Sequence, residues 1–167
     1  MEIIKADPSD LVEIMFLLRE CVKDMNEKGM KQWNNVHPDG SLMKKNLFNG
    51  LIFLVKDKGV CKGMVTLNPE MPEDYNGLIS KEEKEKTLYI QWLAVHPKWQ
   101  NKGISKMLMD YSEEYAKKNG FKSILLDVYN NHELAHQICQ KYNYHEIGKF
   151  HSSMQKIAYV CYAKEIG

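Results

Sequence analysis

The stretch WLAVHPKWQNKGISKMLMDYSEEYAKKNG, Trp92 to Gly120, decides the fold of this 167-residue chain. It starts inside an apolar run that predicts a strand over residues 87–95 and that stops at His96-Pro97. Because this run is apolar on both faces, we expect the strand to lie centrally in a sheet. A short polar loop with one glycine follows, and the spacing of apolar residues then predicts an amphipathic helix over residues 103–119.

The loop over residues 100–106 has features of an anion-binding site. The first amides of a helix have no intrahelical partners, and the helix dipole makes that end partly positive. Gly103 permits a positive φ and a close approach of a ligand to the backbone. Lys102 and Lys106 add charge, and Ser105 adds a hydroxyl donor. The same residues also fit an ordinary strand–helix turn, and GxxxxGK[ST] and GxGxxG are absent, which argues against a P-loop or a dinucleotide-binding fold.

Outward from this stretch, periodicity predicts the other elements. On the N-terminal side we expect a strand over residues 2–6, helices over 8–28 and 38–48, and a hairpin over 51–67. On the C-terminal side we expect a strand over 123–129, a helix over 133–142, and two last strands in YHEIGKF and IAYVCYAKE. This order predicts an α/β protein with helices on both faces of one sheet, as a single domain over residues 1–167.

Composition narrows the function classes. The formal net charge of +1 argues against binding to nucleic acid or to acidic membranes. The four cysteines are far apart and form no CxxC pair, which argues against a zinc site and a disulfide framework and favours a reducing, cytoplasmic location. No secretion signal is recognisable at the N-terminus, and no apolar run reaches the ~18 residues that a membrane span needs.

Two motifs resemble those of the GCN5-related N-acetyltransferase (GNAT) family. LAVHPKWQNKGISKM is similar to its acyl-CoA motif, Gln/Arg-x-x-Gly-x-Gly/Ala, which follows a strand and opens a helix: Gln100 and Gly103 match, and Ser105 departs from it. LLDVYNNHELAHQICQKYNYHEIG resembles the second motif, a strand, an Asn and a helix. The resemblance implies a GNAT-like acyl-CoA N-acyltransferase fold, a central mixed and mostly antiparallel sheet in which the strands at 87–95 and 123–129 splay apart.

The resemblance also implies a reaction. Acetyl-CoA, as cosubstrate, would give its acetyl group to a primary amine by direct attack, without an acyl-enzyme, and a backbone N–H would polarise the acetyl carbonyl. The alternatives are a catalytically impaired acyl-CoA-binding module of the same fold, and a phosphoanion-binding domain without a link to CoA. The residues implied in binding the cosubstrate are Leu93, Ala94, Val95, Gln100, Asn101, Lys102, Gly103, Ile104, Ser105, Lys106 and Asn131.

The general acid is open. In this family a tyrosine on the helix of the second motif often protonates the departing CoA thiolate, and alignment puts Cys139 at that position. A neutral thiol with a pKa of ~8.5 can donate a proton, although a free cysteine is more often a small buried hydrophobe. Tyr142, about one helical turn further on, and Tyr129, at the end of the preceding strand, are the other candidates.

The general base is open as well, since the family often has a carboxylate where this chain has YIQWL. Gln91 cannot accept a proton, but it can position a water. Histidine titrates near neutral pH, which brings in His37 and His96, although His96 lies in a turn that favours a structural role. A water relay is the remaining option. The glutamates before the strand fit a solvated charge run: Glu82, Glu83 and Glu85.

In the family the acceptor pocket is built by segments that here are MKQWNNVHPDG and the long polar connection over residues 68–86. Trp33, Tyr75 and Tyr89 are the implied substrate-binding residues, because an amine can stack on an aromatic ring. Acidic residues of the connection either favour a cationic acceptor or only keep the loop soluble: Glu70, Glu73 and Asp74. A polyamine, an aminoglycoside, an amino acid or a protein N-terminus all remain open. Dimers are common in the family, and IAYVCYAKE could pair across a homodimer interface.

Overall fold

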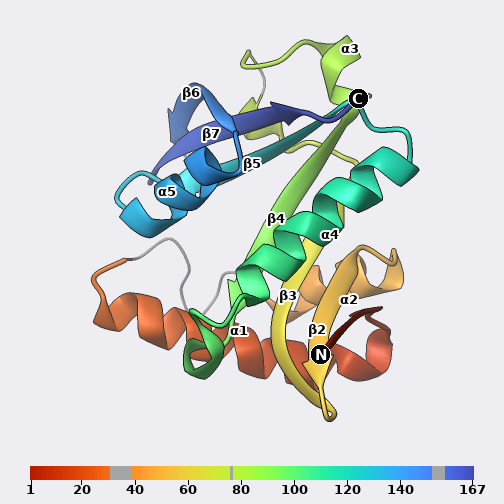
Figure 1. The fold of residues 1–167 in the computed structure, drawn as a ribbon, viewed down its shortest axis with the longest axis vertical. Coiled ribbons are helices and arrows are strands. Elements are labelled where there is room, and N and C mark those ends of the chain that lie inside the picture. The colour runs from red at the N-terminus through yellow and green to blue at the C-terminus, as the bar shows by residue number, and fades with distance from the viewer. Residues whose placement is uncertain (31–38, 76, 152–156) are drawn as a thin grey trace. The chain divides into compact units, whose positions relative to one another are not determined.

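A computed structural model describes residues 1–30, 39–75, 77–151 and 157–167 (Figure 1). Among these residues, hydrogen bonds join seven strands in the order β1-β2-β3-β4-β5-β7-β6. The strands are β1 (Glu2–Lys5), β2 (Ile52–Asp57), β3 (Val60–Asn68), β4 (Thr87–Val95), β5 (Ser123–Tyr129), β6 (His145–His151) and β7 (Ala158–Glu165). The helices are α1 (Leu11–Glu27), α2 (Gly40–Phe48), α3 (Lys81–Lys84), α4 (Ile104–Lys118) and α5 (Glu133–Lys141), with 3-10 turns η1 (Pro8–Asp10), η2 (Glu73–Tyr75) and η3 (Pro97–Trp99).

This architecture confirms the predicted mixed α/β fold. β4 is the middle strand of the order, as its apolar character on both faces predicts. β4 and β5 run parallel, whereas β1–β2, β2–β3, β5–β7 and β6–β7 are antiparallel. The β4–β5 ladder runs from Thr87↔Ser123 to Ile90↔Leu126, and the second half of β4 extends beyond it. The sequence did not predict α3 and η2, because such short elements leave no periodic pattern.

The described chain divides into two compact units. Unit 1 comprises Met1–Leu67 and Trp92–Tyr111, and unit 2 comprises Asn68–Gln91 and Ser112–Gly167. The division falls inside β4 and inside α4, so each of these elements belongs to both units. Each unit has its own hydrophobic core.

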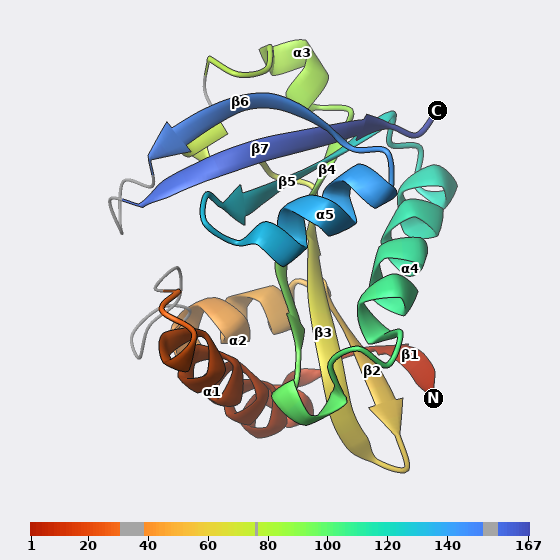
Figure 2. The same cartoon turned by 60° about the vertical axis from the view of Figure 1, so that its left-hand side comes forward.

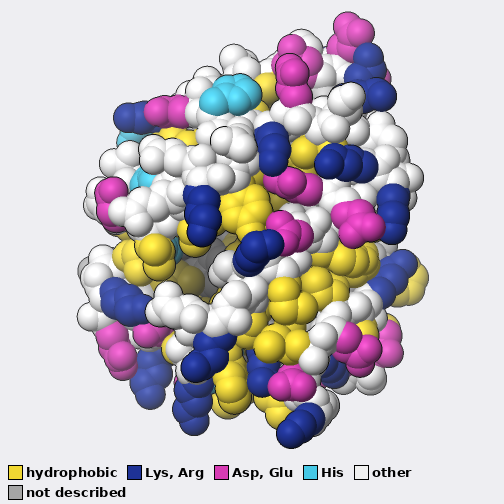
Figure 3. All heavy atoms as spheres, viewed as in Figure 1, with side chains coloured by type: hydrophobic (Ala, Val, Ile, Leu, Met, Phe, Trp, Pro, Cys, Tyr) yellow, Lys and Arg dark blue, Asp and Glu magenta, His cyan; other side chains and the backbone are white. Residues whose placement is uncertain are grey.

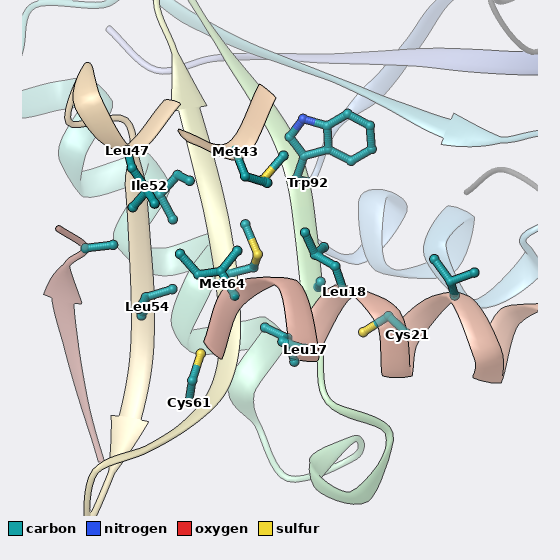
Figure 4. Close-up of a cluster of buried hydrophobic side chains, with 14 residues drawn as sticks. Leu17, Leu18, Cys21, Met43, Leu47, Ile52, Leu54, Cys61, Met64 and Trp92 are labelled. Atoms are coloured by element: carbon teal, nitrogen blue, oxygen red, sulfur yellow. The ribbon is translucent and has the colours of Figure 1, made fainter. Parts of the chain in front are cut away.

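In unit 1, the strands carry apolar side chains on both faces. Ile52 and Leu54 of β2 pack in one cluster with the buried sides of α1 and α2 (Figure 4). Phe53 points to the opposite face, as alternation along a strand requires, and its ring lies 5.1 Å from that of Tyr111 on α4. The helices α1 and α2 therefore cover one face of these strands, and the first half of α4 covers the other.

The β2–β3 hairpin contains a one-residue shift in register. Val55 pairs with Gly63 and Lys56 pairs with Cys61, so Lys62 is an extra residue in β3. Such a bulge shifts the alternation of side chains by one position. It returns Cys61 to the face that packs on α1, where it joins the core cluster.

Unit 2 is built on the first half of β4 with β5, β7 and β6. Figure 2 shows β5, β7 and β6 side by side, with α5 beside them. One face of these strands carries a cluster of Tyr89, Leu125 and Cys161, which the 68–86 connection covers with Tyr75. β7 pairs with β5 along one edge and with β6 along the other. Both edges of β7 are thus used within the chain, which removes the basis for the expectation that this strand pairs across a dimer interface.

Two properties of the described residues concern membrane crossing and surface charge. Among the described residues, no helix combines the length and the apolar character that crossing a membrane requires. Figure 3 shows basic and acidic side chains interspersed over the visible face, in keeping with the net charge of +1.

Candidate functional site

Hydrogen bonds made by side chains of the turn itself stabilise the turn that follows β4. His96 begins η3: its Nδ1 accepts from the Lys98 amide at 3.1 Å, and its carbonyl accepts from the Trp99 amide at 2.8 Å. The side chain of Gln100 donates from Nε2 to the Val95 carbonyl at 3.3 Å. The side chain of His96 therefore has the structural role that the sequence favoured, and Gln100 ties the start of the 100–106 loop to the end of β4.

Two residues in this loop have a left-handed backbone. Asn101 has a φ of 61° and Gly103 a φ of 83°, and these residue types adopt that conformation most readily. The Met107 amide donates to the Gly103 carbonyl at 3.1 Å, so helical hydrogen bonding starts at Gly103, which has no side chain to cap the first turn. Apart from Gly103 and its two chain neighbours, no atom of the described residues lies within 4 Å of the position that a Cβ on Gly103 would take. Exposed backbone and open space before a helix N-terminus fit a phosphate group.

Lys62 of β3 anchors the η3 turn that leads into this loop, and sequence reasoning missed it. Its Nζ lies 3.7 Å from the centre of the Trp99 ring and 2.8 Å from Asp57 Oδ2, and its carbonyl accepts from the His96 amide at 2.9 Å. The hydrogen bond from Lys62 lowers the pKa of the Asp57 carboxyl below its usual value. The bulge places the Lys62 side chain in this position, and only the strand register reveals it, because a single lysine in a strand gives no sequence signal.

Packing against β3 holds the first turn of α4 in place. Ile104 is buried, with 1% exposure, and packs against Gly63 of β3. Its contribution to the loop is therefore its backbone amide. Lys102 is exposed, and Lys106 pairs with Asp110 at 2.6 Å on the surface of the helix. Ser105, which departs from the family pattern, is half-buried.

The second half of β4 contains a bend. Trp92 has a φ of 52°, a conformation that costs a bulky residue ~1–3 kcal/mol and that is found most often near functional sites. Leu93 beyond it is half-buried, whereas Ala94 and Val95 are buried. The Val95 carbonyl also accepts from Cys21 Sγ at 3.4 Å, so it is engaged within unit 1.

The predicted acids lie in unit 2. Cys139 of α5 is 1% exposed, and burial raises the pKa of its thiol to about 12. Both observations favour the packing role of Cys139. Tyr142 follows the last turn of α5 with its hydroxyl oxygen buried, and the ring of Tyr129 lies 6.4 Å from that of Tyr159. Asn131 is exposed in the turn before α5.

The expectation that Tyr75 lies open in a polar loop is wrong. Its side chain is fully buried, and Tyr89 is 4% exposed. Both hydroxyls donate to the same oxygen of Asp127, Tyr75 at 3.0 Å and Tyr89 at 2.7 Å. Burial, followed by the neighbouring tyrosine and carboxylate, raises the pKa of Tyr75, and burial followed by the Asp127 charge raises the pKa of Tyr89. Sequence reasoning did not single out Asp127, because its partners are far away along the chain.

The remaining candidate site residues are half-buried, exposed or outside the described ranges. Gln91 is half-buried in β4, and Trp33 and His37 lie outside the described residues. The Glu83 amide donates to Ser80 Oγ at 3.1 Å and its carboxylate accepts from the Ser80 amide at 3.4 Å, so this residue caps α3. The side chains of the other acidic candidates that the structure describes are exposed: Glu70, Glu73, Glu82 and Glu85. Within the described ranges, no group of three or more His, Cys, Asp or Glu side chains is arranged to hold a metal ion.

Comparisons with known proteins place this geometry in context. No curated protein sequence matches the chain. Solved structures match its fold closely: a GNAT-family acetyltransferase from Streptococcus agalactiae has a TM-score of 0.83 at 16% identity, and one from Listeria monocytogenes has 0.80 at 18% identity; each match covers 98% of this chain and 94% of the other. The yncA protein of Salmonella typhimurium, solved with its cofactor acetyl-CoA, has a TM-score of 0.75 at 14% identity, covering 100% of this chain and 94% of that one.

At these identities the solved structures establish the fold alone. The family assignment comes from the sequence itself. The model of the acetyltransferase (GNAT) family matches residues 16–144, which is most of the chain and includes the first motif described above and most of the second. The chain therefore belongs to the GNAT family of acetyltransferases.

Proposed function

We propose that this chain transfers an acetyl group from acetyl-CoA to a primary amine. The observation that carries the proposal is the 100–106 loop, where left-handed Asn101 and Gly103 lead into the first turn of α4 with open space at Gly103. Acetyl-CoA would supply an acetyl group already activated as a thioester. We also propose that residues 1–167 act as one domain, because β4 and α4 each belong to both compact units.

The loop is proposed to hold the diphosphate of the cosubstrate. The amides of residues 101–106 provide the donors, and Lys102 adds a positive charge. Lys106 adds a second charge, because an exposed i,i+4 pair such as that with Asp110 is weak and opens easily. Gln100 and Lys62 act as positioning residues, since their hydrogen bonds fix the turn between β4 and α4.

The backbone of Leu93–Val95 is proposed to orient the acetyl thioester. An N–H of this segment would stabilise the negative charge that develops on the acetyl oxygen when the amine attacks. The bend at Trp92 supports this role, because a left-handed residue turns the peptide groups that follow it away from a regular ladder. Attack is direct, so no residue of this chain becomes acylated.

Two protons must move in this reaction. The amine loses one, and Gln91, an amide, can only position the water that receives it. The departing thiolate gains one, for which Cys139 and Tyr142 are the proposed donors. Burial raises the pKa of the Cys139 thiol to about 12, which favours a packing role for that residue and leaves Tyr142 as the donor to test first.

The test is CoA binding by a Gly103→Glu variant. CoA and acetyl-CoA should raise the melting temperature of the wild type, and Gly103→Glu should weaken CoA binding by at least ~10-fold, because a carboxylate then faces the diphosphate. Gly59→Glu is the matched control: Gly59 has a φ of 79° and the same open space, but it lies in the β2–β3 turn. Unchanged CoA affinity in a folded Gly103→Glu variant would contradict the proposal.

A thiol-release assay with acetyl-CoA and a panel of amines then separates turnover from binding. Release above buffer hydrolysis with any amine supports the transferase. Raised melting temperature without release from any amine identifies the chain as an acyl-CoA-binding module instead.

A further inference from the structure

A groove with a volume of about 470 Å³ lies between η1 and the solvent side of α2, within unit 1. The residues that line it are Pro8, Ser41, Lys44, Lys45 and Phe48. The four residues from α2 are spaced three and four positions apart, so they form one stripe along the helix. The other side of α2 faces the core, where Met43 and Leu47 join the cluster of unit 1.

Short-range hydrogen bonds hold both walls of the groove. On the η1 side, Asp7 and Asp10 form a capping box around the turn that begins with Pro8, whose ring fixes its own φ. On the α2 side, Asp39 Oδ1 accepts from the Leu42 amide at 2.7 Å and caps the helix. The groove is therefore formed before any ligand arrives, as is usual for small-molecule sites.

Apolar side chains at the groove are open to solvent. Phe48 is 85% exposed, and Val12, which follows Pro8 by four residues and so lies about one turn further on, is 82% exposed. A single exposed apolar residue is ordinary, but here the exposed rings and methyl groups adjoin a preformed hollow. A ligand with a hydrocarbon body gains free energy by covering them, because apolar surface then leaves water.

The charge around the groove is positive. Lys44 and Lys45 are exposed, α2 contains no acidic residue, and within the described ranges neither ammonium group belongs to an ion pair. Lys5 adds a third ammonium group: its Nζ lies 2.9 Å from the position that a Cβ on Gly50 would take, two residues beyond Phe48. The carboxylates of both walls accept from backbone amides as helix caps. The groove therefore favours an anionic head group.

The dimensions of the groove favour a small molecule. A stable protein interface needs about 800 Å² on each partner, far more than five residues around one hollow provide, whereas small-molecule sites span roughly 300–1,000 Å³. The stripe from Ser41 to Phe48 covers seven helical steps, about 10 Å. With bonds of ~1.5 Å in a zigzag, an extended chain of roughly eight carbons has that length.

We propose that this groove binds a small, free amphiphilic carboxylate: a straight-chain fatty acid of medium length. The head group lies near Ser41, Lys44 and Lys45, where a hydroxyl and two ammonium groups can donate to it. The hydrocarbon chain lies against Pro8 and Phe48. The proposal goes beyond acetyl transfer and does not rest on it, because the lining includes no residue of the 100–106 loop or of Leu93–Val95.

The experiment is a two-dimensional ¹H–¹⁵N NMR titration of the full chain with octanoate, with and without saturating CoA. Saturable shifts are expected at amides of residues 41–48, with the same dissociation constant in both titrations. Propanoate, which is five methylene groups shorter, should bind at least ~10-fold more weakly. Octan-1-ol, which has the same chain without the charge, should bind several-fold more weakly.

Two variants divide the contributions of charge and chain. Lys44→Gln/Lys45→Gln should weaken octanoate binding by roughly 5-fold and leave octan-1-ol binding unchanged, because it removes the charge alone. Phe48→Ser should weaken the binding of both ligands by roughly 5-fold, because it removes apolar contact. Both sites are exposed, so both variants should fold. Lys117→Gln/Lys118→Gln, two neighbouring exposed lysines at the end of α4, is the matched control and should bind octanoate like the wild type.

Several results would overturn the proposal. These are an absence of shifts at residues 41–48, equal binding of octan-1-ol and octanoate, or unchanged octanoate affinity in Lys44→Gln/Lys45→Gln. Loss of octanoate binding when CoA is added would place the ligand in the cosubstrate site instead. Co-sedimentation with phosphatidylglycerol vesicles, without any response to octanoate, would assign this face to a lipid surface and would equally contradict the small-molecule site.

Discussion

Gly63 of β3 lies against β4 and the start of α4, and Gly63→Ala tests that packing. A Cβ at this position would lie 2.8 Å from Ile104 Cγ2, 3.2 Å from the Ala94 carbonyl oxygen and 3.4 Å from Leu108 Cδ1. Ile104 is buried and β-branched, so it cannot easily rotate away. Overpacking of this kind costs about 1–3 kcal/mol.

The opposing term is small. Replacing glycine by alanine where the backbone is unstrained stabilises a protein by ~0.4–1 kcal/mol through the unfolded chain. The difference of the two central values predicts a loss of about 1.3 kcal/mol in the free energy of unfolding. For a chain of this size that lowers Tm by roughly 3–5 °C.

Urea unfolding, followed by far-UV circular dichroism, measures this difference. Gly40→Ala is the matched control, because Gly40 begins α2 and, beyond its own helix and chain neighbours, no described atom lies within 4 Å of the position that its Cβ would take. That variant should be as stable as the wild type or slightly more so. If Gly63→Ala equals or exceeds the wild type in stability, the close approach of α4 to β3 is not as described, and the reasoning fails. If the reasoning holds, KM for acetyl-CoA should also rise, since Ile104 directly follows Gly103 of the loop.

Two further predictions concern Lys62, beside the loop, and the buried thiol of Cys139. Lys62→Met should lower the free energy of unfolding by about 1 kcal/mol through loss of the contact with the Trp99 ring and should raise KM for acetyl-CoA; an unchanged KM in a folded variant would show that Lys62 does not position the loop. Because burial raises the pKa of Cys139 to about 12, its thiol contributes stability that is complete below the unfolded pKa of ~8.5 and is lost as pH rises from there toward 12. Urea unfolding of Cys139→Ala at pH 7 and 10 should therefore show a smaller alkaline loss of stability than the wild type. An equal loss in both would contradict the burial of this thiol, and an altered pH–rate profile would favour Cys139 over Tyr142 as the acid.

Local signals in the sequence predicted much of this fold. The apolar run of β4, the glycine after it and the periodicity of α4 are read within a few residues of one another, and the structure confirms the strand and the helix. The left-handed backbone at Gly103 is also a local property, because glycine adopts it without steric cost. A polar, proline-containing segment such as 68–86 gives no comparable signal, so α3 and η2 were not predicted.

The side chains that sequence reasoning missed or misjudged depend on partners far along the chain. Tyr75 lies in a polar stretch of the sequence. In the structure its hydroxyl donates to Asp127, 52 positions further along the chain, and the surrounding rings bury its side chain. Lys62 reaches the loop only because a bulge makes it an extra residue in β3. A side-chain contact between distant segments decides the first case and strand register decides the second, and a single sequence shows neither.

The bend at Trp92 has a consequence for how this chain can change over evolution. Trp92→Gly would relieve the left-handed backbone, yet it would remove the indole from the cluster with Leu18 and Met43, and the second effect is the larger. Trp92→Ala would keep the backbone cost and lose the packing as well. The shape of β4 beside the loop is therefore inherited together with the hydrophobic core of unit 1. If Leu93–Val95 orient the acetyl thioester as proposed, substitutions that merely loosen this core also change that geometry, so selection on stability and selection on specificity act on the same side chain.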